Sequence, residues 1–574
     1  MCPEHGATIW EGVLVRKWPS SFSYVFLSLL TIVCLAPFSG RAVHVDDLLF
    51  VRAAQQIAQH PADPYGFQIN WEFAEAPMFE ITQNPPLASY YIALVARVAG
   101  WSERALHLGF ILVAIALVLG TYRLAQKFTR SPLLASLCAL LTPGVLVSAT
   151  SLMCDTMMLA IWVWAAYFWI EGLDSGKSWL LSISALLTAA SALTKYFGAS
   201  LILLLLVYSV VRLRRIGTYL LYLIIPVVIL LAYEFWSANL YGHGLLQGAA
   251  EFAQSQRDVR RGSLLGMSVV GLSYTGGCSL AGLSFAYFIW SRTRLIAGLV
   301  ASAIAAIPVA AGWLDTTWLD MANIEAQAKP SLTWFGGFEL ALGIAAGIFL
   351  LALAIKDFWQ LKDANSLFLG LWLLGTFFFA TYVNWTVNAR SVLPLIPAAG
   401  IMVARSFDAC RSTAKRAFAI QVVVILLALS AFLSLWIAAG DSELANSERA
   451  AATLVRQKTL NQGSTVWFVG HWGFQYYMES LGVPALDLIH PQVHSGDFVV
   501  IPRNNSNVVP ILAKFVASQE YLELPLKTWA TTISPELGAG FYSSYWGPLP
   551  YAIGPVPVES YAIIRLGAVP EPEK

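Results

Sequence analysis

The sequence is poor in charged residues and has no clustered cysteines or histidines. Only 12% of the 574 residues are charged, whereas soluble domains carry about 25%. The six cysteines stand singly, without a CxxC motif or a Cys/His cluster, which argues against a disulfide framework and against a zinc site. No repeat of fixed period is present, and the net charge of +1 gives no sign of nucleic-acid binding. The sequence therefore predicts neither a disulfide-rich secreted domain nor a partner among the nucleic acids.

Apolar residues are abundant instead and form long runs. They make up 57% of the chain and gather, over the first 440 residues, in runs near the length of about 20 residues that crosses a bilayer. Basic clusters follow alternate runs, which predicts thirteen membrane-spanning helices with a cytoplasmic N-terminus, because Lys and Arg are retained inside. The predicted spans are Phe22–Gly40, Ala105–Leu124, Leu133–Ser151, Thr156–Trp169, Trp179–Leu193, Phe197–Val211, Tyr219–Trp236, Leu264–Trp290, Leu295–Leu314, Phe338–Ile355, Leu367–Tyr382, Val392–Ala404 and Ala417–Ala439.

Composition divides the chain into three predicted parts. Residues 1–21 form a cytoplasmic N-terminus, residues 22–439 a transmembrane domain and residues 440–574 an external domain. Residues 41–104, the first external loop, are too polar to span a membrane and should form amphipathic helices along its surface. After residue 440, "STVWFVG", "GDFVVIP" and "SYAIIRLG" are typical of strands. The predicted fold is a polytopic α-helical membrane protein with a C-terminal α/β or α+β soluble domain.

Ionisable residues gather on the predicted external face. They are Asp46, Asp47, Asp155, Lys195, Arg257, Arg260, Arg261 and Arg390. External Lys and Arg run against the usual charge distribution, so anionic partners are expected, and ionisable groups at membrane depth tend to mark function. A carboxylate can act as general base toward an acceptor, and cations can stabilise a departing phosphate. The pattern favours attack on a substrate whose leaving group is a phosphate.

Five motifs in a fixed order resemble the integral-membrane glycosyltransferases of the C superfamily, especially the branch of protein O-mannosyltransferases and lipid A aminoarabinose transferases. The resemblance covers roughly residues 20 to 405. One departure is Asn84, which stands where a His or Lys usually precedes two prolines. The motifs are "VDDLLFVRAAQQIAQH", "QNPPLASYYIALVARVAG", "SLMCDTMMLAIW", "ALTKYFG" and "ARSVLPLIPAAG".

The resemblance implies transfer of a sugar from a polyprenyl-phosphate carrier to an acceptor, with inversion of the anomeric carbon. No cofactor is required by this chemistry, although a divalent metal is compatible with it. Asp46 would be the general base, and Asp47 and Asp155 would orient acceptor, sugar or base. The implied donor site combines phosphate-binding bases with two residues of the donor loop: Lys195, Arg257, Arg260, Arg390, Asn84 and Tyr90.

The implied location is the bacterial cytoplasmic membrane, with the active site and the C-terminal domain in the periplasm. The sugar stays open, as does the choice among a lipid, protein or polysaccharide acceptor. The alternative function is a transporter, flippase or non-catalytic binder of a polyprenyl-linked glycan. The simplest alternative for Asp46 and Asp47 is helix capping, and Lys195 could merely extend its charge to the membrane surface. Arg257 and its neighbours could bind lipid headgroups.

Overall fold

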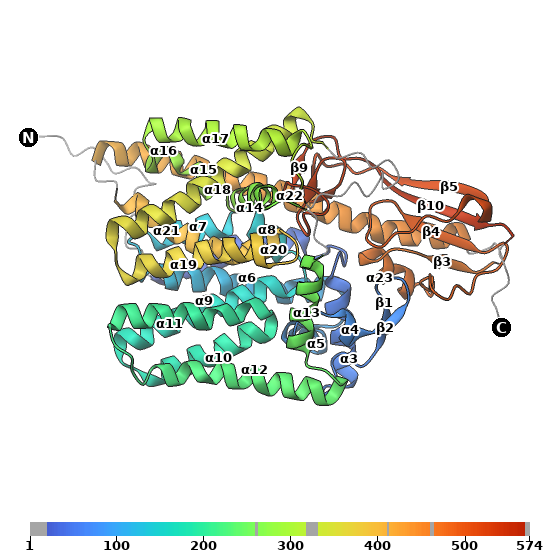
Figure 1. The fold of residues 1–574 in the computed structure, drawn as a ribbon, viewed down its shortest axis with the longest axis horizontal. Helices are drawn as coiled ribbons and strands as arrows, with labels where there is room; N and C mark the ends of the chain where they lie inside the picture. The colour runs from blue at the N-terminus through green and yellow to red at the C-terminus, as the bar shows by residue number, and fades with distance from the viewer. Residues whose placement is uncertain (1–19, 259–261, 317–330, 410–412, 460–463, 569–574) are drawn as a thin grey trace, which may run out of the picture.

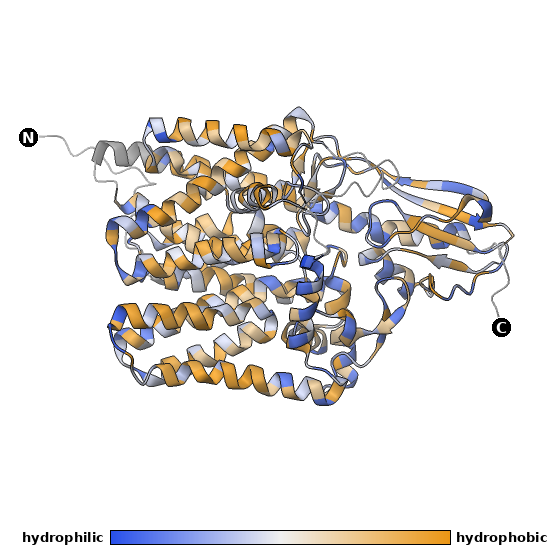
Figure 2. Cartoon of the chain, in the orientation of Figure 1, coloured by the Kyte–Doolittle hydropathy of each residue, from blue (hydrophilic) through white to orange (hydrophobic). Residues whose placement is uncertain are grey.

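The computed structural model describes residues 20–258, 262–316, 331–409, 413–459 and 464–568. Most of the described chain is helical, and its strands lie in the first loop and after residue 464 (Figure 1). Hydrophobic side chains dominate the long helices of the bundle, whereas hydrophilic ones are concentrated in α13 and in the C-terminal region (Figure 2). The predicted N-terminal part lies almost wholly outside the described residues.

Ten helices of the described residues are long and apolar enough to cross a membrane. Several of them run across Figure 1 in a common direction as one bundle. The prediction of a polytopic α-helical membrane protein is confirmed. These spans are α2 (Ser20–Leu35) with the turn after it, α6 (Glu103–Ala125), α9 (Cys154–Ser175), α11 (Ser200–Leu213) with the turn before it, α12 (Leu220–Tyr241), α17 (Arg292–Ala310), α18 (Trp334–Leu361), α19 (Ala364–Phe378) with the turn after it, α21 (Ile396–Asp408) with the turns before it, and α22 (Thr413–Thr459).

Among the described residues, ten helices qualify as spans by length and apolar composition, or eleven with one bent pair; this is fewer than the thirteen predicted, because some apolar runs do not form long straight helices. The third predicted span is a pair, α7 (Pro132–Leu140) and α8 (Pro143–Ala149), bent by 64°. Pro143 begins the second helix, since proline lacks the N–H that would continue the first. The fifth predicted span is α10 (Ser178–Thr194), an apolar helix of only 17 residues.

The eighth predicted span departs most from expectation. Helix α14 (Leu264–Ser279) ends at Leu280, whose φ is +49°, and the chain continues in the single turns α15 (Ala281–Ser284) and α16 (Ala286–Ile289). Figure 1 views α14 nearly along its axis, whereas α17 and α18 lie across the picture. Helices α14 and α18 cross in close contact at Gly276. Only glycine fits there, because a Cβ on Gly276 would lie 1.9 Å from the carbonyl oxygen of Gly343 in α18.

The first loop forms short helices and a hairpin. Helices α3 (Asp47–Gln59), α4 (Met78–Ile81) and α5 (Leu87–Ala99) accompany the antiparallel strands β1 (Gln68–Asn70) and β2 (Glu75–Pro77). The expected amphipathic helices of this loop are therefore present as α3 and α5.

The C-terminal region contains a mixed four-stranded sheet in the order β3–β4–β10–β5. The three predicted strands are confirmed as β3 (Val466–Phe468), β4 (Phe498–Pro502) and β10 (Glu559–Leu566), and β5 (Val516–Leu524) forms one edge. Strand β3 is parallel to β4, whereas β10 is antiparallel to both of its neighbours. Helix α23 (Trp472–Ser480) follows β3.

Helix α22 connects the bundle with this region. Its 47 residues span about 70 Å at 1.5 Å per residue, more than twice the thickness of the hydrocarbon core. Its later turns contact α23, β5 and β6 (Ala530–Thr531). The domain boundary predicted at residue 440 therefore falls inside one continuous helix.

Candidate active site

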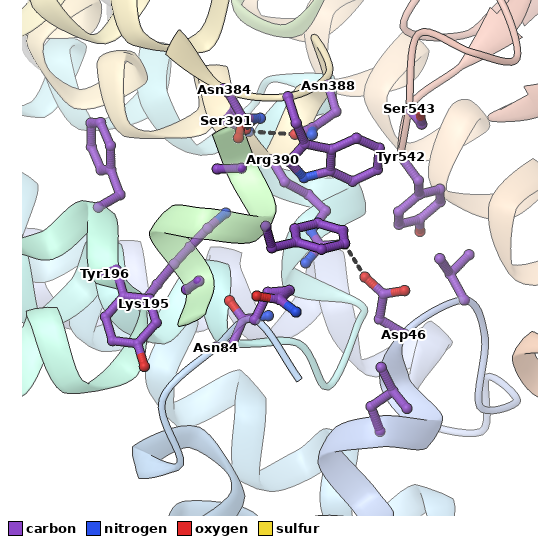
Figure 3. Close-up of a pocket in the computed structure, with 18 of the residues that line it drawn as sticks. Asp46, Asn84, Lys195, Tyr196, Asn384, Asn388, Arg390, Ser391, Tyr542 and Ser543 are labelled. Atoms are coloured by element: carbon purple, nitrogen blue, oxygen red, sulfur yellow. Dashed lines mark hydrogen bonds and ion pairs between the residues drawn. The ribbon is translucent and has the colours of Figure 1, made fainter. Parts of the chain in front are cut away.

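A cavity of about 840 Å³ lies where the first loop, the bundle and the C-terminal region meet. Five residues of the predicted site line this cavity: Asp46, Asn84, Lys195, Arg257 and Arg390. All of them except Arg257 are labelled in Figure 3. Segments far apart in sequence thus contribute to one pocket.

Ion pairs connect four of the predicted residues in a chain. Arg390 Nη1 lies 2.5 Å from Asp46 Oδ2, and Arg390 Nε lies 2.8 Å from Asp155 Oδ2. Lys195 Nζ lies 2.5 Å from Asp155 Oδ1. The Asp155 side chain is 2% exposed and that of Asp46 30%. Two cations therefore enclose Asp155 behind the cavity wall, while the carboxylate of Asp46 faces the cavity.

Helix ends bring these side chains together. Asp46 is the N-cap residue of α3, Asp155 lies in the first turn of α9, and Lys195 is the C-cap residue of α10. Helix N-termini favour negative charge, so both acids occupy suitable positions. The turn before α3 is strained, because Val45 has a φ of +48°, and such backbone costs about 1–3 kcal/mol and clusters at functional sites. The side chain of Asp46 makes no capping hydrogen bond, which removes the simplest alternative for it.

Asp47 has different surroundings from Asp46. Its carboxylate is fully buried and lies 3.2 Å from Arg41 Nη1. It accepts hydrogen bonds from the backbone N–H groups of Leu152 (2.8 Å) and His44 (3.2 Å). Burial raises the pKa of Asp47 to about 6, against the opposing effect of Arg41. Asp47 is not among the cavity-lining residues, so in this structure it connects the start of α3 to the loop before α9.

A buried cluster that the sequence did not predict, the Arg41 junction, consists of Arg41, Asp47, Asp441 and Tyr542. Arg41 Nη2 lies 2.8 Å from Asp441 Oδ2 and donates to the hydroxyl of Tyr542 at 3.3 Å. Tyr542 donates to Asp441 Oδ1 at 3.0 Å, and burial raises the pKa of Tyr542 well above its usual value. The junction joins the first loop, α22 and the C-terminal region. The one signal in the sequence is Arg41 itself, a lone cation directly after an apolar run.

The remaining predicted residues are distributed unevenly. Arg257, at the end of α13 (Leu245–Asp258), lines the cavity, whereas Arg260 and Arg261 lie outside the described residues. Tyr90 does not line the cavity, and its hydroxyl donates to the carbonyl of Pro61 at 2.5 Å. Asn84 lines the cavity, and its side-chain oxygen lies 3.5 Å from Cys154 Sγ.

The C-terminal region supplies a wall of the cavity that the sequence did not predict. Sequence patterns gave no chemistry for this region. Its cavity-lining residues are Trp472, Ser506, Asn507, Tyr542, Ser543, Tyr545 and Trp546. No group of three or more His, Cys, Asp or Glu residues suited to holding a metal ion occurs within the described ranges.

Comparison with known proteins bears on part of this site. Residues 83–236 match the family described as dolichyl-phosphate-mannose-protein mannosyltransferase. The predicted resemblance to membrane glycosyltransferases is confirmed. The matched segment includes Asn84, Asp155 and Lys195. A search of curated protein sequences found no match to the chain.

Solved structures with a similar course of the chain include an archaeal oligosaccharyltransferase and ArnT. The archaeal oligosaccharyltransferase AglB from Archaeoglobus fulgidus is 13% identical, with a TM-score of 0.47 over 82% of this chain and 64% of AglB. ArnT from Cupriavidus metallidurans is 14% identical, with a TM-score of 0.42 over 84% of this chain and 92% of ArnT. The chain thus spans less than two thirds of the length of AglB.

Proposed function

We propose that the chain transfers a sugar from a polyprenyl-phosphate donor to an acceptor hydroxyl or amine, with inversion of the anomeric carbon. The observation that carries the proposal is the position of Asp46. Its carboxylate is paired with Arg390 at 2.5 Å, yet it lines a cavity that also contains Lys195 and Arg257. Base and cations are thus available to one bound substrate.

The proposed chemistry needs a base on one side of the anomeric carbon and positive charge on the other. Asp46 accepts the proton of the acceptor, whose oxygen or nitrogen forms a bond to the anomeric carbon. The bond between this carbon and the phosphate oxygen breaks, and its electrons remain on the polyprenyl phosphate. Lys195, Arg257 and Arg390 stabilise the charge on that leaving group.

Three cations at the cavity support a phosphate ligand. Lys195, Arg257 and Arg390 line the cavity together with the acids Asp46, Glu72 and Glu80, and Asp155 lies behind Lys195 and Arg390. A polyprenyl-phosphate sugar carries one negative charge on its phosphodiester. Binding of the donor would place this phosphate beside Lys195, Arg257 and Arg390.

For the location, we propose the bacterial cytoplasmic membrane, with the cavity and the C-terminal region on the periplasmic side. This assignment is supported by the distribution of basic clusters between the apolar runs of the sequence. A lipid-linked donor would reach a cavity at that surface without crossing water.

The test compares Asp46→Asn with wild type in lipid nanodiscs. The donors are the labelled undecaprenyl-phosphate sugars that membranes of the source organism form from labelled nucleotide sugars. We expect release of undecaprenyl phosphate to fall by at least about 100-fold, the contribution of a general base. Binding of undecaprenyl phosphate itself should persist, because the cations remain.

The control is Glu75→Gln, which removes an exposed carboxylate of the same loop that does not line the cavity. It should release undecaprenyl phosphate at the wild-type rate. Wild-type release by Asp46→Asn would refute the assignment of the base. Movement of the intact donor across the membrane, without release by the wild-type protein, would favour the transporter instead.

A further inference from the structure

The walls of the cavity differ in chemistry. Its cations, Lys195, Arg257 and Arg390, all come from the bundle and from α13. The described residues after 464 that line the cavity include no charged side chain. Four of them are aromatic: Trp472, Tyr542, Tyr545 and Trp546. Three are neutral and polar: Ser506, Asn507 and Ser543. Figure 3 shows Tyr542 and Ser543 on one side of the pocket and Lys195 on the other.

The aromatic rings of this wall support one another and leave ring surface available. Trp472 and Trp546 pack edge to face with their centroids 5.4 Å apart. Tyr545 packs against Trp385, which also lines the cavity, at 5.8 Å. Tyr545 and Trp385 are only half-buried, and both line the cavity.

Hydrogen bonds fix the wall relative to the charged residues. The backbone N–H of Ala389 donates to the carbonyl of Phe541, and that of Ser544 donates to the carbonyl of Val387, both at 2.8 Å. These bonds join residues 541–544 of the wall to the segment that carries Arg390. The Arg41 junction anchors Tyr542 from behind. Such a wall is ordered before a ligand binds, which lowers the entropic cost of binding.

We propose that this wall binds the acceptor and that the acceptor is a carbohydrate, an inference that rests on the proposed function. A sugar ring has faces of C–H groups, which pack on the electron-rich faces of aromatic rings. Its hydroxyls match the amide and hydroxyl groups of Asn507, Ser506 and Ser543. A phosphate or other anionic headgroup would find no cation among the described residues of this wall, and Asp46 lies in the same cavity to receive the proton of a sugar hydroxyl.

The first experiment identifies the class of acceptor. Wild-type protein in nanodiscs receives the labelled undecaprenyl-phosphate sugar pool together with cell-envelope polysaccharide, glycolipid or protein fractions of the source organism. We expect label in polysaccharide, or in the oligosaccharide that mild acid releases from glycolipid, and these two arms distinguish the source of the carbohydrate. Label on protein side chains, or on a part of a lipid that is not sugar, would overturn the proposal.

The second experiment tests the wall with Tyr545→Ala and Trp385→Ala. Loss of one ring contact should raise the KM for the carbohydrate fraction about tenfold, with a much smaller change in kcat. The affinity for undecaprenyl phosphate should stay as in wild type, and Tyr545→Phe should retain the wild-type KM. The matched control is Tyr521→Ala, which removes an exposed tyrosine of the C-terminal region, 62% accessible and remote from the cavity.

The outcomes separate the two proposals. Release of undecaprenyl phosphate with label transferred to protein would support the proposed function but would refute the proposal that the acceptor is a carbohydrate. A parallel loss of donor affinity and kcat in Tyr545→Ala would likewise refute it, since this is the signature of general damage. A wild-type protein that releases no undecaprenyl phosphate from any donor would refute both.

Discussion

Two adjacent aspartates in this chain have opposite environments. Asp46 lines the cavity with a 30% exposed side chain, whereas Asp47 is fully buried against Arg41. Consecutive residues at the start of a helix point in directions about 100° apart, because an α-helix has 3.6 residues per turn. From the sequence, Asp46 was predicted to be the general base and Asp47 to orient acceptor, sugar or base. The geometry favours a positioning role for Asp47, since its hydrogen bond to Leu152 connects the two helix starts that bear Asp46 and Asp155.

The Arg41 junction yields a prediction at the scale of one residue. Arg41→Met keeps the side-chain length but leaves the carboxylates of Asp47 and Asp441 buried without their cation. We expect the free energy of unfolding to fall by about 3–5 kcal/mol, the cost of breaking a buried ion pair. Scanning fluorimetry in detergent should show a clearly lower melting temperature.

The control is Arg449→Met, which removes an arginine that is 38% exposed and paired with Glu103 at the edge of the same region. An exposed pair contributes about 0–1 kcal/mol, so its melting temperature should stay close to that of wild type. Equal shifts for the two variants would show that the Arg41 junction does not stabilise the fold.

Much of the charged site could be predicted from sequence, because membrane topology forces exported cations to find anionic partners. Asp155, Lys195 and Arg390 were therefore expected near Asp46. The aromatic wall, which is the part of the cavity lining supplied by the C-terminal region, could not be predicted. Its residues, such as Tyr542 and Trp546, reach the cavity only through long-range contacts. Nothing in their local sequence distinguishes them from ordinary loop aromatics.

Among the helices, hydropathy identified the apolar runs but not their direction or continuity. A run of about 20 apolar residues is compatible with one span, with a bent pair such as α7 and α8, or with a crossing helix such as α14 followed by single turns. Backbone-to-backbone contact decides between them at α14, where glycines meet α18. Such contacts depend on the partner helix and cannot be predicted from a hydropathy pattern.

The crossing of α14 and α18 gives a prediction at the scale of the element. In Gly276→Ala the new Cβ would overlap the carbonyl oxygen of Gly343, so we expect a loss of about 1–3 kcal/mol of stability. Tyr274 of the same helix donates to the carbonyls of Gly540 and Gly547, at 2.6 and 2.9 Å. The variant should therefore also loosen the C-terminal loop, which limited proteolysis would detect.

Gly375→Ala is the matched control, because a Cβ on this glycine of α19 meets no atom within 4 Å. Alanine favours helix by up to about 1 kcal/mol over glycine, so this variant should melt at the wild-type temperature or slightly above it. If Gly276→Ala melted like Gly375→Ala, the close crossing would not be important for stability.

For the whole molecule, the proposed sidedness can be tested by cysteine labelling. The four cysteines within the described residues are buried, and Cys2 and Cys410 can be replaced by serine. In that background we expect His490→Cys, whose native side chain is 81% exposed, to react in intact cells with an impermeant maleimide. Lys177→Cys, on an exposed turn between α9 and α10, should react only after lysis. The reverse pattern would invert the proposed topology.

Helix α22 makes the thickness of the bilayer relevant to the cavity. It runs unbroken for 47 residues from the bundle into the C-terminal region, and Asp441 in its later half contacts Arg41 and Tyr542. Tilting a rod of about 70 Å by about 5° moves its far end by about 6 Å. Helices tilt when the surrounding hydrocarbon becomes thinner. A change in lipid composition would thereby tilt α22 and shift the aromatic residues of the cavity wall that are connected to it.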